Sequence, residues 1–184
     1  MKAVLVRLSA LALMTFAGCS EPDTAAPLVE PEAVTEEAKQ AGSIELSGSG
    51  IWGAGKQVAF GSDRTDAETL LAEVTRSAAE PTSNAECGAG PMEFSRYPYG
   101  LTLNFQDGKL AGWLLDESSS GFGLRSGPNI GDAQEEVLAR AGFAAIADST
   151  LGEEFYSEAE GLGGFFEAGK VASLYAGMDL RKFY

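Results

Sequence analysis

A set of residues between positions 93 and 111 recurs 61 positions later, and this repeat restricts the fold more than any other feature. Upstream, a second block recurs at a shift of 66, in which Gly61, Asp66 and Ala67 return as Gly127, Asp132 and Ala133. Matched order over two blocks is the pattern that a tandem duplication leaves. The sequence therefore predicts one domain over residues 43–184 with two related halves, about 57–118 and 121–184. The block that recurs at a shift of 61 consists of Glu93-Phe94, Gly100-Leu101, Phe105, Gly108-Lys109 and Ala111, which return as Glu154-Phe155, Gly161-Leu162, Phe166, Gly169-Lys170 and Ala172.

Each half has the pattern of a short strand, a helix and an antiparallel hairpin. In the first half, residues 57–60 are expected to form the strand, and Thr65 with Glu68 has the spacing of a capping box that starts a helix at Asp66. Asp107-Gly108 is a strong two-residue hairpin turn between alternating segments. In the second half, Asp132 with Glu135 caps the helix, and Ala168-Gly169 takes the place of the turn. These patterns predict an α+β fold, in which two helices pack on antiparallel sheet.

At the level of architecture alone, this arrangement resembles the tandem helix-plus-sheet repeats of the β-lactamase inhibitor protein and of small outer-membrane assembly lipoproteins. A shared architecture is weak support for a shared function. The resemblance therefore implies a fold of two related halves and no particular activity.

The first 18 residues have the pattern of a secretory signal peptide, with Lys2 and Arg7 before a short apolar segment that is too short to span a bilayer. Cys19 at its exit resembles the lipobox of bacterial lipoproteins, although Phe16 stands where that family usually has Leu. The resemblance implies that Cys19 becomes a lipidated amino terminus that anchors the protein in the cell envelope. Because Ser20 rather than Asp follows, it implies the outer membrane, facing the periplasm, in a Gram-negative cell. Residues 19–42 are acidic, contain three prolines and no aromatic residue, and are expected to be a disordered tether.

The charge and composition exclude several functions. The chain carries 27 acidic and 13 basic residues, a net charge of −14, which disfavours nucleic-acid binding and leaves a cationic partner open. It contains no histidine, so the triads that use a histidine base are absent from this chain. With Cys19 acylated, Cys87 has no intramolecular partner, and we expect a buried thiol, with an intermolecular disulfide as the alternative.

Two glycine motifs and several acid pairs suggest chemistry that the surrounding sequence does not support. Residues 48–53 match G-x-G-x-x-G and residues 50–56 match G-x-x-x-x-G-K, but a strand rather than a helix is expected to follow both. Pairs of acids could in principle serve a glycoside hydrolase or bind calcium. None has the spacing of a calcium loop, so no cofactor and no metal is expected. The pairs are Asp63 with Asp66, Asp116 with Glu117, Glu135 with Glu136 and Glu153 with Glu154.

Aromatic residues at expected turns are the better candidates for a binding surface. Trp and Tyr are enriched at protein interfaces because they combine apolar area with a polar group. Trp52 and the Tyr97-Pro98-Tyr99 turn are the candidate contact residues, with a place in the core as the alternative for each. We expect a non-catalytic domain that binds another envelope protein. The alternatives are a lipoprotein that binds a small ligand or glycan, and a carboxylate-dependent hydrolase.

Overall fold

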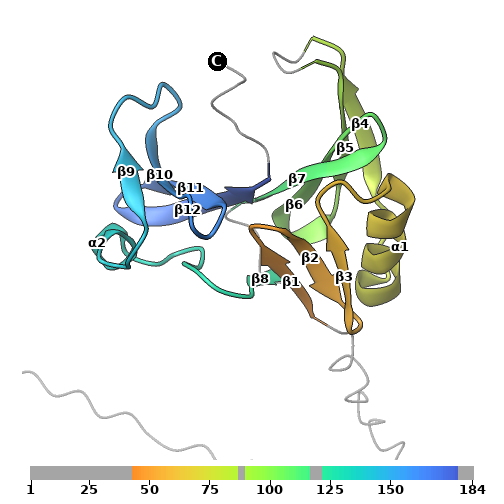
Figure 1. The fold of residues 1–184 in the computed structure, drawn as a ribbon, viewed down its shortest axis with the longest axis horizontal. Helices are drawn as coiled ribbons and strands as arrows, with labels where there is room; N and C mark the ends of the chain where they lie inside the picture. The colour runs from red at the N-terminus through yellow and green to blue at the C-terminus, as the bar shows by residue number, and fades with distance from the viewer. Residues whose placement is uncertain (1–42, 87–89, 117–121, 178–184) are drawn as a thin grey trace, which may run out of the picture. The chain divides into compact units, whose positions relative to one another are not determined.

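Strands dominate the structure, a computed structural model that describes residues 43–86, 90–116 and 122–177 (Figure 1). The prediction of an α+β fold with two helices packed on a sheet is wrong, because the described residues form twelve strands in two sheets and only one helix longer than five residues. The strands are β1 (Ile44–Ser47), β2 (Gly50–Gly53), β3 (Lys56–Ala59), β4 (Glu80–Asn84), β5 (Met92–Arg96), β6 (Leu101–Gln106), β7 (Lys109–Leu115), β8 (Phe122–Leu124), β9 (Ala144–Ile146), β10 (Glu153–Ser157), β11 (Leu162–Glu167) and β12 (Lys170–Ala176). The helices are α1 (Arg64–Thr75) and α2 (Gln134–Leu138), with a 3-10 turn at Pro98–Gly100.

The larger sheet has eight strands, and its order reads β4-β5-β6-β7-β12-β11-β10-β9. Each half of this order is a meander of consecutive strands, and the two meanders join where β7 pairs antiparallel with β12 (Figure 1). We call this junction the seam, and its three pairs are Leu115 with Leu174, Leu114 with Tyr175, and Trp113 with Ala176. The hairpins at residues 101–115 and 162–176 have the predicted turns, since Asp107 and Ala168 both have a left-handed φ, of 50° and 51°.

Equivalent hydrogen bonds connect the two meanders to the segments before α1 and α2. The Gly61 N–H donates to the Leu110 carbonyl, and the Gly131 N–H donates to the Val171 carbonyl, each at 2.8 Å. Gly131, rather than the Gly127 of the sequence alignment, therefore occupies the place of Gly61. A duplication as the origin of this arrangement stays a prediction.

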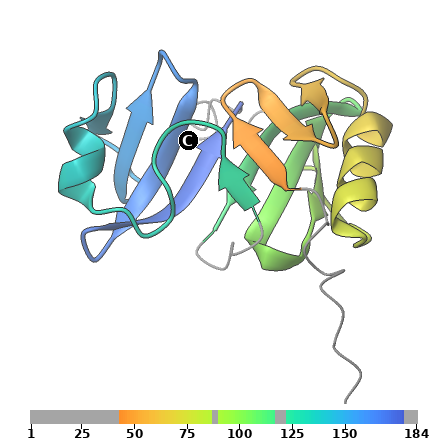
Figure 2. The ribbon, with the colours of Figure 1, turned by 90° about the horizontal axis from the view of Figure 1, so that it is seen from below.

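The smaller sheet has the order β3-β2-β1-β8 and lies against one half of the larger sheet (Figures 1 and 2). β1 pairs parallel with β8, and β2 and β3 form a hairpin whose two-residue turn has left-handed φ values at Ala54 and Gly55, as this turn type requires. The buried Trp113 indole N–H donates to the Ser47 carbonyl at 2.9 Å, which ties β7 to the end of β1. The core lies between the two sheets and under α1.

Both helices differ from the expected ones in where they begin. α1 begins at Arg64 rather than Asp66, and Glu68 contacts Arg64 and Ser95 instead of closing a capping box with Thr65. α2 begins at Gln134 and has five residues, of which only Val137 is buried. A longer α2 would have little apolar surface to bury, so tertiary packing gives it no support.

Candidate functional site

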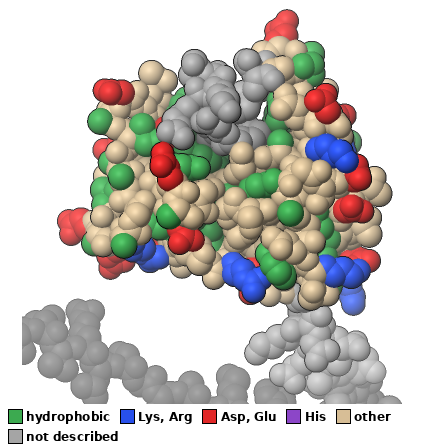
Figure 3. Space-filling view, viewed as in Figure 1, with side chains coloured by type: hydrophobic (Ala, Val, Ile, Leu, Met, Phe, Trp, Pro, Cys, Tyr) green, Lys and Arg blue, Asp and Glu red, His purple; other side chains and the backbone are tan. Residues whose placement is uncertain are grey.

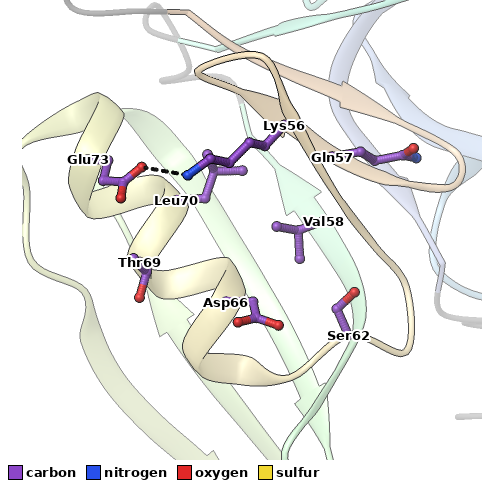
Figure 4. A pocket seen from close by; sticks show the side chains of 8 residues that line it. All are labelled: Lys56, Gln57, Val58, Ser62, Asp66, Thr69, Leu70 and Glu73. Carbon is purple, nitrogen blue, oxygen red and sulfur yellow. Dashed lines mark ion pairs between the residues drawn. The ribbon is translucent and has the colours of Figure 1, made fainter.

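A groove runs between β3 and α1, and Figure 4 shows the side chains that line it. Its volume is about 280 Å³, and its floor is apolar, since Val58 on β3 and Leu70 on α1 are both buried. Polar side chains form the rim. The Lys56 ammonium lies 3.8 Å from the Glu73 carboxylate and bridges the two walls near one end, while Asp66 lies toward the other end (Figure 4).

β3 is the edge of the smaller sheet, so half of its backbone polar groups point away from β2. The Phe60 N–H donates to the Ser49 carbonyl at 3.0 Å, which fixes the antiparallel alternation. Val58 therefore bonds to β2, while Gln57 and Ala59 direct their N–H and carbonyl groups outward. The Ala59 carbonyl accepts from the Ser62 N–H, and no described residue bonds to the outward groups of Gln57.

The other strand edges among the described residues are shorter or are blocked. β4 contains Pro81, which lacks a donor, and charged Glu80. β9 and β8 have three residues each. Native sheets protect their edges with proline, charge and short strands, because an open edge pairs with other chains. β3 has four residues and no proline, and its one charged residue, Lys56, is paired with Glu73 on the helix that forms the second wall of the groove.

The groove has a negative electrostatic balance. Its charged side chains are one lysine, Lys56, and two acids, Asp66 and Glu73. Nearby, Lys109 is held 2.7 Å from Asp63. Acidic side chains are also spread over the face in Figure 3 rather than gathered in one patch. A segment with a positive charge is therefore favoured at the groove over an acidic one.

The structure separates the three aromatic residues predicted to form a binding surface. Trp52 lies on β2 opposite Gln57, with the Arg125 guanidinium 4.1 Å from the centre of its ring, and so lies one strand away from the open edge of β3. Tyr97 is 6% exposed and belongs to the core. Tyr99 is 57% exposed, in the Pro98–Gly100 turn, with a left-handed φ of 67°. The lipidation candidate Cys19, the tether at 19–42 and Cys87 lie outside the described residues.

The acids of the hydrolase alternative have structural contacts or lie apart. Asp63 pairs with Lys109, and Glu154 is buried, where the Tyr175 hydroxyl donates to its carboxylate at 2.5 Å. Within residues 43–86, 90–116 and 122–177, no three acidic or cysteine side chains form a group that could hold a metal ion.

Sequence reasoning missed the groove because its walls come from separate elements. Lys56 and Glu73 each look like ordinary surface charges, and only the packing of α1 brings them together. One local signal could have pointed to the groove. The Ala54-Gly55 turn pairs β3 with β2 in a hairpin, and this pairing determines which backbone groups of β3 point away from β2.

Comparison of the chain with protein-family models, curated sequences and solved structures finds no match. No helix within the described residues is long and apolar enough to cross a membrane.

Proposed function

We propose that this protein is a lipid-anchored lipoprotein of the bacterial cell envelope whose folded domain binds another protein without catalysis. The lipobox-like segment ending at Cys19 supports the anchor, and the acidic residues 20–42 support a tether between anchor and domain. Two or three acyl chains hold a protein on a membrane stably. The partner is then an envelope protein within reach of that membrane.

The open edge of β3 beside α1 is the observation that carries the binding proposal. An extended segment can join a sheet as a further strand, in which case main-chain hydrogen bonds supply affinity and side-chain pockets supply specificity. The outward N–H and carbonyl of Gln57 supply the main-chain bonds. Val58 and Leu70 supply the apolar pocket.

The groove also defines the chemistry of the segment. Alternate side chains of an added strand point to one face, so every second residue enters the space between β3 and α1. An apolar residue fits over Val58 and Leu70, and a Lys or Arg two positions away meets Asp66 or Glu73. The partner segment is therefore extended, mixed apolar and basic, and free of proline at the paired positions.

The test is a crosslinked pull-down of the lipidated protein from its own envelope, with Gln57→Pro as the main variant. Proline removes the outward N–H and leaves the ladder to β2 intact, because edge strands tolerate proline where the N–H faces away. We expect Gln57→Pro to lose the partner while Gln57→Ala, which keeps the N–H, retains it.

A Cys19→Ala control separates the anchor from the groove. We expect it to release the protein from the membrane but to leave binding of a purified partner unchanged. Equal capture by wild type and Gln57→Pro, with both folded, would contradict docking at β3. Capture of no partner by the wild type would contradict the binding function itself.

A further inference from the structure

Three aromatic side chains of the second meander lie on the face of the larger sheet that points away from the core. Tyr175 alternates along β12 with Leu174 and Ala176, which belong to the core between the two sheets, so its ring points to the opposite face. The rings of Tyr156 and Phe165 lie beside it, with centroids 6.3 Å and 5.7 Å from that of Tyr175. We call these three rings the outer aromatic face. None of them belongs to the core, and the smaller sheet lies on the other side of the larger sheet (Figure 1).

A buried carboxylate lies beside this face. Glu154 is 4% exposed, and the Tyr175 hydroxyl donates to its Oε1 at 2.5 Å. Phe155 belongs to the core, so its two neighbours in β10, Glu154 and Tyr156, both point to the outer side. Within the described residues, no lysine or arginine forms an ion pair with Glu154. A buried carboxylate is costly unless a cation compensates it, so this position favours a basic side chain from another part of the chain.

The chain turns out of the larger sheet directly after β12. Ala176 is the last residue of β12 that pairs with β7. The next place along β7 is already taken, because the Gly61 N–H donates to the Leu110 carbonyl there. Gly177 bends the chain with a left-handed φ of 86°. The core side is closed, since a Cβ at Gly177 would lie 2.7 Å from Cζ of Phe60, which packs against the core. The chain after Gly177 is therefore directed toward the outer side of the sheet.

The seven residues that follow, 178–184, have a sequence that complements this outer side. Alternate side chains of an extended segment point to one side. One side of this segment is therefore apolar with a single positive charge, and it consists of Met178, Leu180, Lys182 and Tyr184. The other side carries Asp179, Arg181 and Phe183. The outer aromatic face presents three rings and one buried acid, which match the first of these two sides.

We propose that residues 178–184 dock in extended form on the outer aromatic face, with Lys182 ion-paired to Glu154. The reach is sufficient, because seven extended residues span about 23 Å, whereas β10 lies two strand spacings, about 10 Å, from β12. The apolar side chains of the segment cover the rings, and the Lys182 ammonium compensates the buried carboxylate. The segment then shields an aromatic surface that would otherwise be a contact site for other proteins.

Lys182→Gln is the deciding variant and Arg181→Gln is its matched control, because these neighbours have the same charge but point to opposite sides of an extended segment. We expect Lys182→Gln to lower the urea midpoint of the full-length protein by about 1 M or more, because it leaves Glu154 buried and unpaired. Arg181→Gln should leave the midpoint unchanged. Adding Glu154→Gln to Lys182→Gln should restore most of the loss, because it removes the unpaired charge.

Nuclear Overhauser effects in the wild-type protein test the contact without any substitution. We expect such effects between the Leu180 methyl groups and the ring protons of Tyr156, and none between copies in a mixture of labelled and unlabelled protein. Their absence would overturn the proposal, as would effects found only between copies, which would assign the face to a second copy of the chain. Equal midpoints for Lys182→Gln and Arg181→Gln, or no recovery on adding Glu154→Gln, would overturn the ion pair and with it the proposed docking.

Discussion

Replacing Gly163 by alanine tests how side chains pack along one row of paired residues that runs across the strands of the larger sheet. The row runs across the seam, where Leu114 and Tyr175 are paired. In the first meander Leu114 pairs with Thr102, whereas in the second Tyr175 pairs with Gly163. Tyr156 pairs with the same glycine from the other side, and the rings of Tyr156 and Tyr175 are stacked with centroids 6.3 Å apart. The glycine therefore makes room for two rings above it.

A methyl group at Gly163 has no space. Its Cβ would lie 2.4 Å from Cζ and 2.5 Å from the hydroxyl oxygen of Tyr175, and 2.8 Å from Cδ2 of Tyr156. The Tyr175 ring must move, and its 2.5 Å hydrogen bond to the buried Glu154 carboxylate is then lost. Overpacking costs about 1–3 kcal/mol, and an unpaired buried acceptor costs about 1–3 kcal/mol more. We expect Gly163→Ala to lower the free energy of unfolding by about 3 kcal/mol or more.

Urea unfolding followed by tryptophan fluorescence measures this loss. With a slope of about 2 kcal/mol/M, the midpoint should fall by about 1.5 M. Gly123→Ala in β8 is the matched control, because a Cβ there meets nothing within 4 Å, and it should stay within about 0.5 kcal/mol of wild type. Tyr175→Phe should cost less in the Gly163→Ala background than in wild type, because the hydrogen bond is already lost. Additive losses, or an unchanged midpoint for Gly163→Ala, would refute this packing.

Two further predictions concern the network at Glu68 and the link between the sheets. Burial raises the pKa of Glu68, but the hydrogen bonds from Ser95 and Arg64 outweigh burial and lower this pKa below the ordinary 4.5. The network therefore stabilises the protein above pH 4.5, and this stabilisation is lost as the pH falls through the lowered pKa. Ser95→Ala should therefore destabilise at neutral pH and approach wild type in acid, in a series of urea midpoints against pH. Trp113→Phe removes the bond to the Ser47 carbonyl and leaves a cavity, and it should cost about 2 kcal/mol in thermal unfolding; a loss under about 0.5 kcal/mol would contradict the link.

The elements that the sequence predicted correctly are those set by local residues. The hairpin turns at Asp107-Gly108 and Ala168-Gly169 need only two residues and flanking alternation, and both are present. Elements without such a local signal are different: α1 ends at Thr75, and Pro81 follows it as part of the strand β4. The strand pairs with Met92–Arg96, a contact that local pattern does not encode.

The candidate sites depend on contacts that no local pattern contains. Tyr97 seemed to belong to an exposed turn because Pro98 and Gly100 follow it, yet its backbone N–H bonds to the Leu101 carbonyl and its ring enters the core. The pairing of Ser95 with Glu68 joins β5 to α1 across 27 positions. Such placements follow from tertiary packing, so residue types alone did not reveal the groove between β3 and α1.

The seam also has a consequence for how the chain folds. Within each meander the pairing strands are close in the sequence, so their contacts form rapidly. The seam instead joins residues 113–115 to residues 174–176, and contacts between such distant residues form more slowly. A chain that is synthesised from its amino terminus can complete the first meander early. β7 then remains an unpaired edge until β12 has emerged, and unpaired edges are prone to aggregate. We therefore expect this chain to be most vulnerable to aggregation in the interval before its last strand arrives.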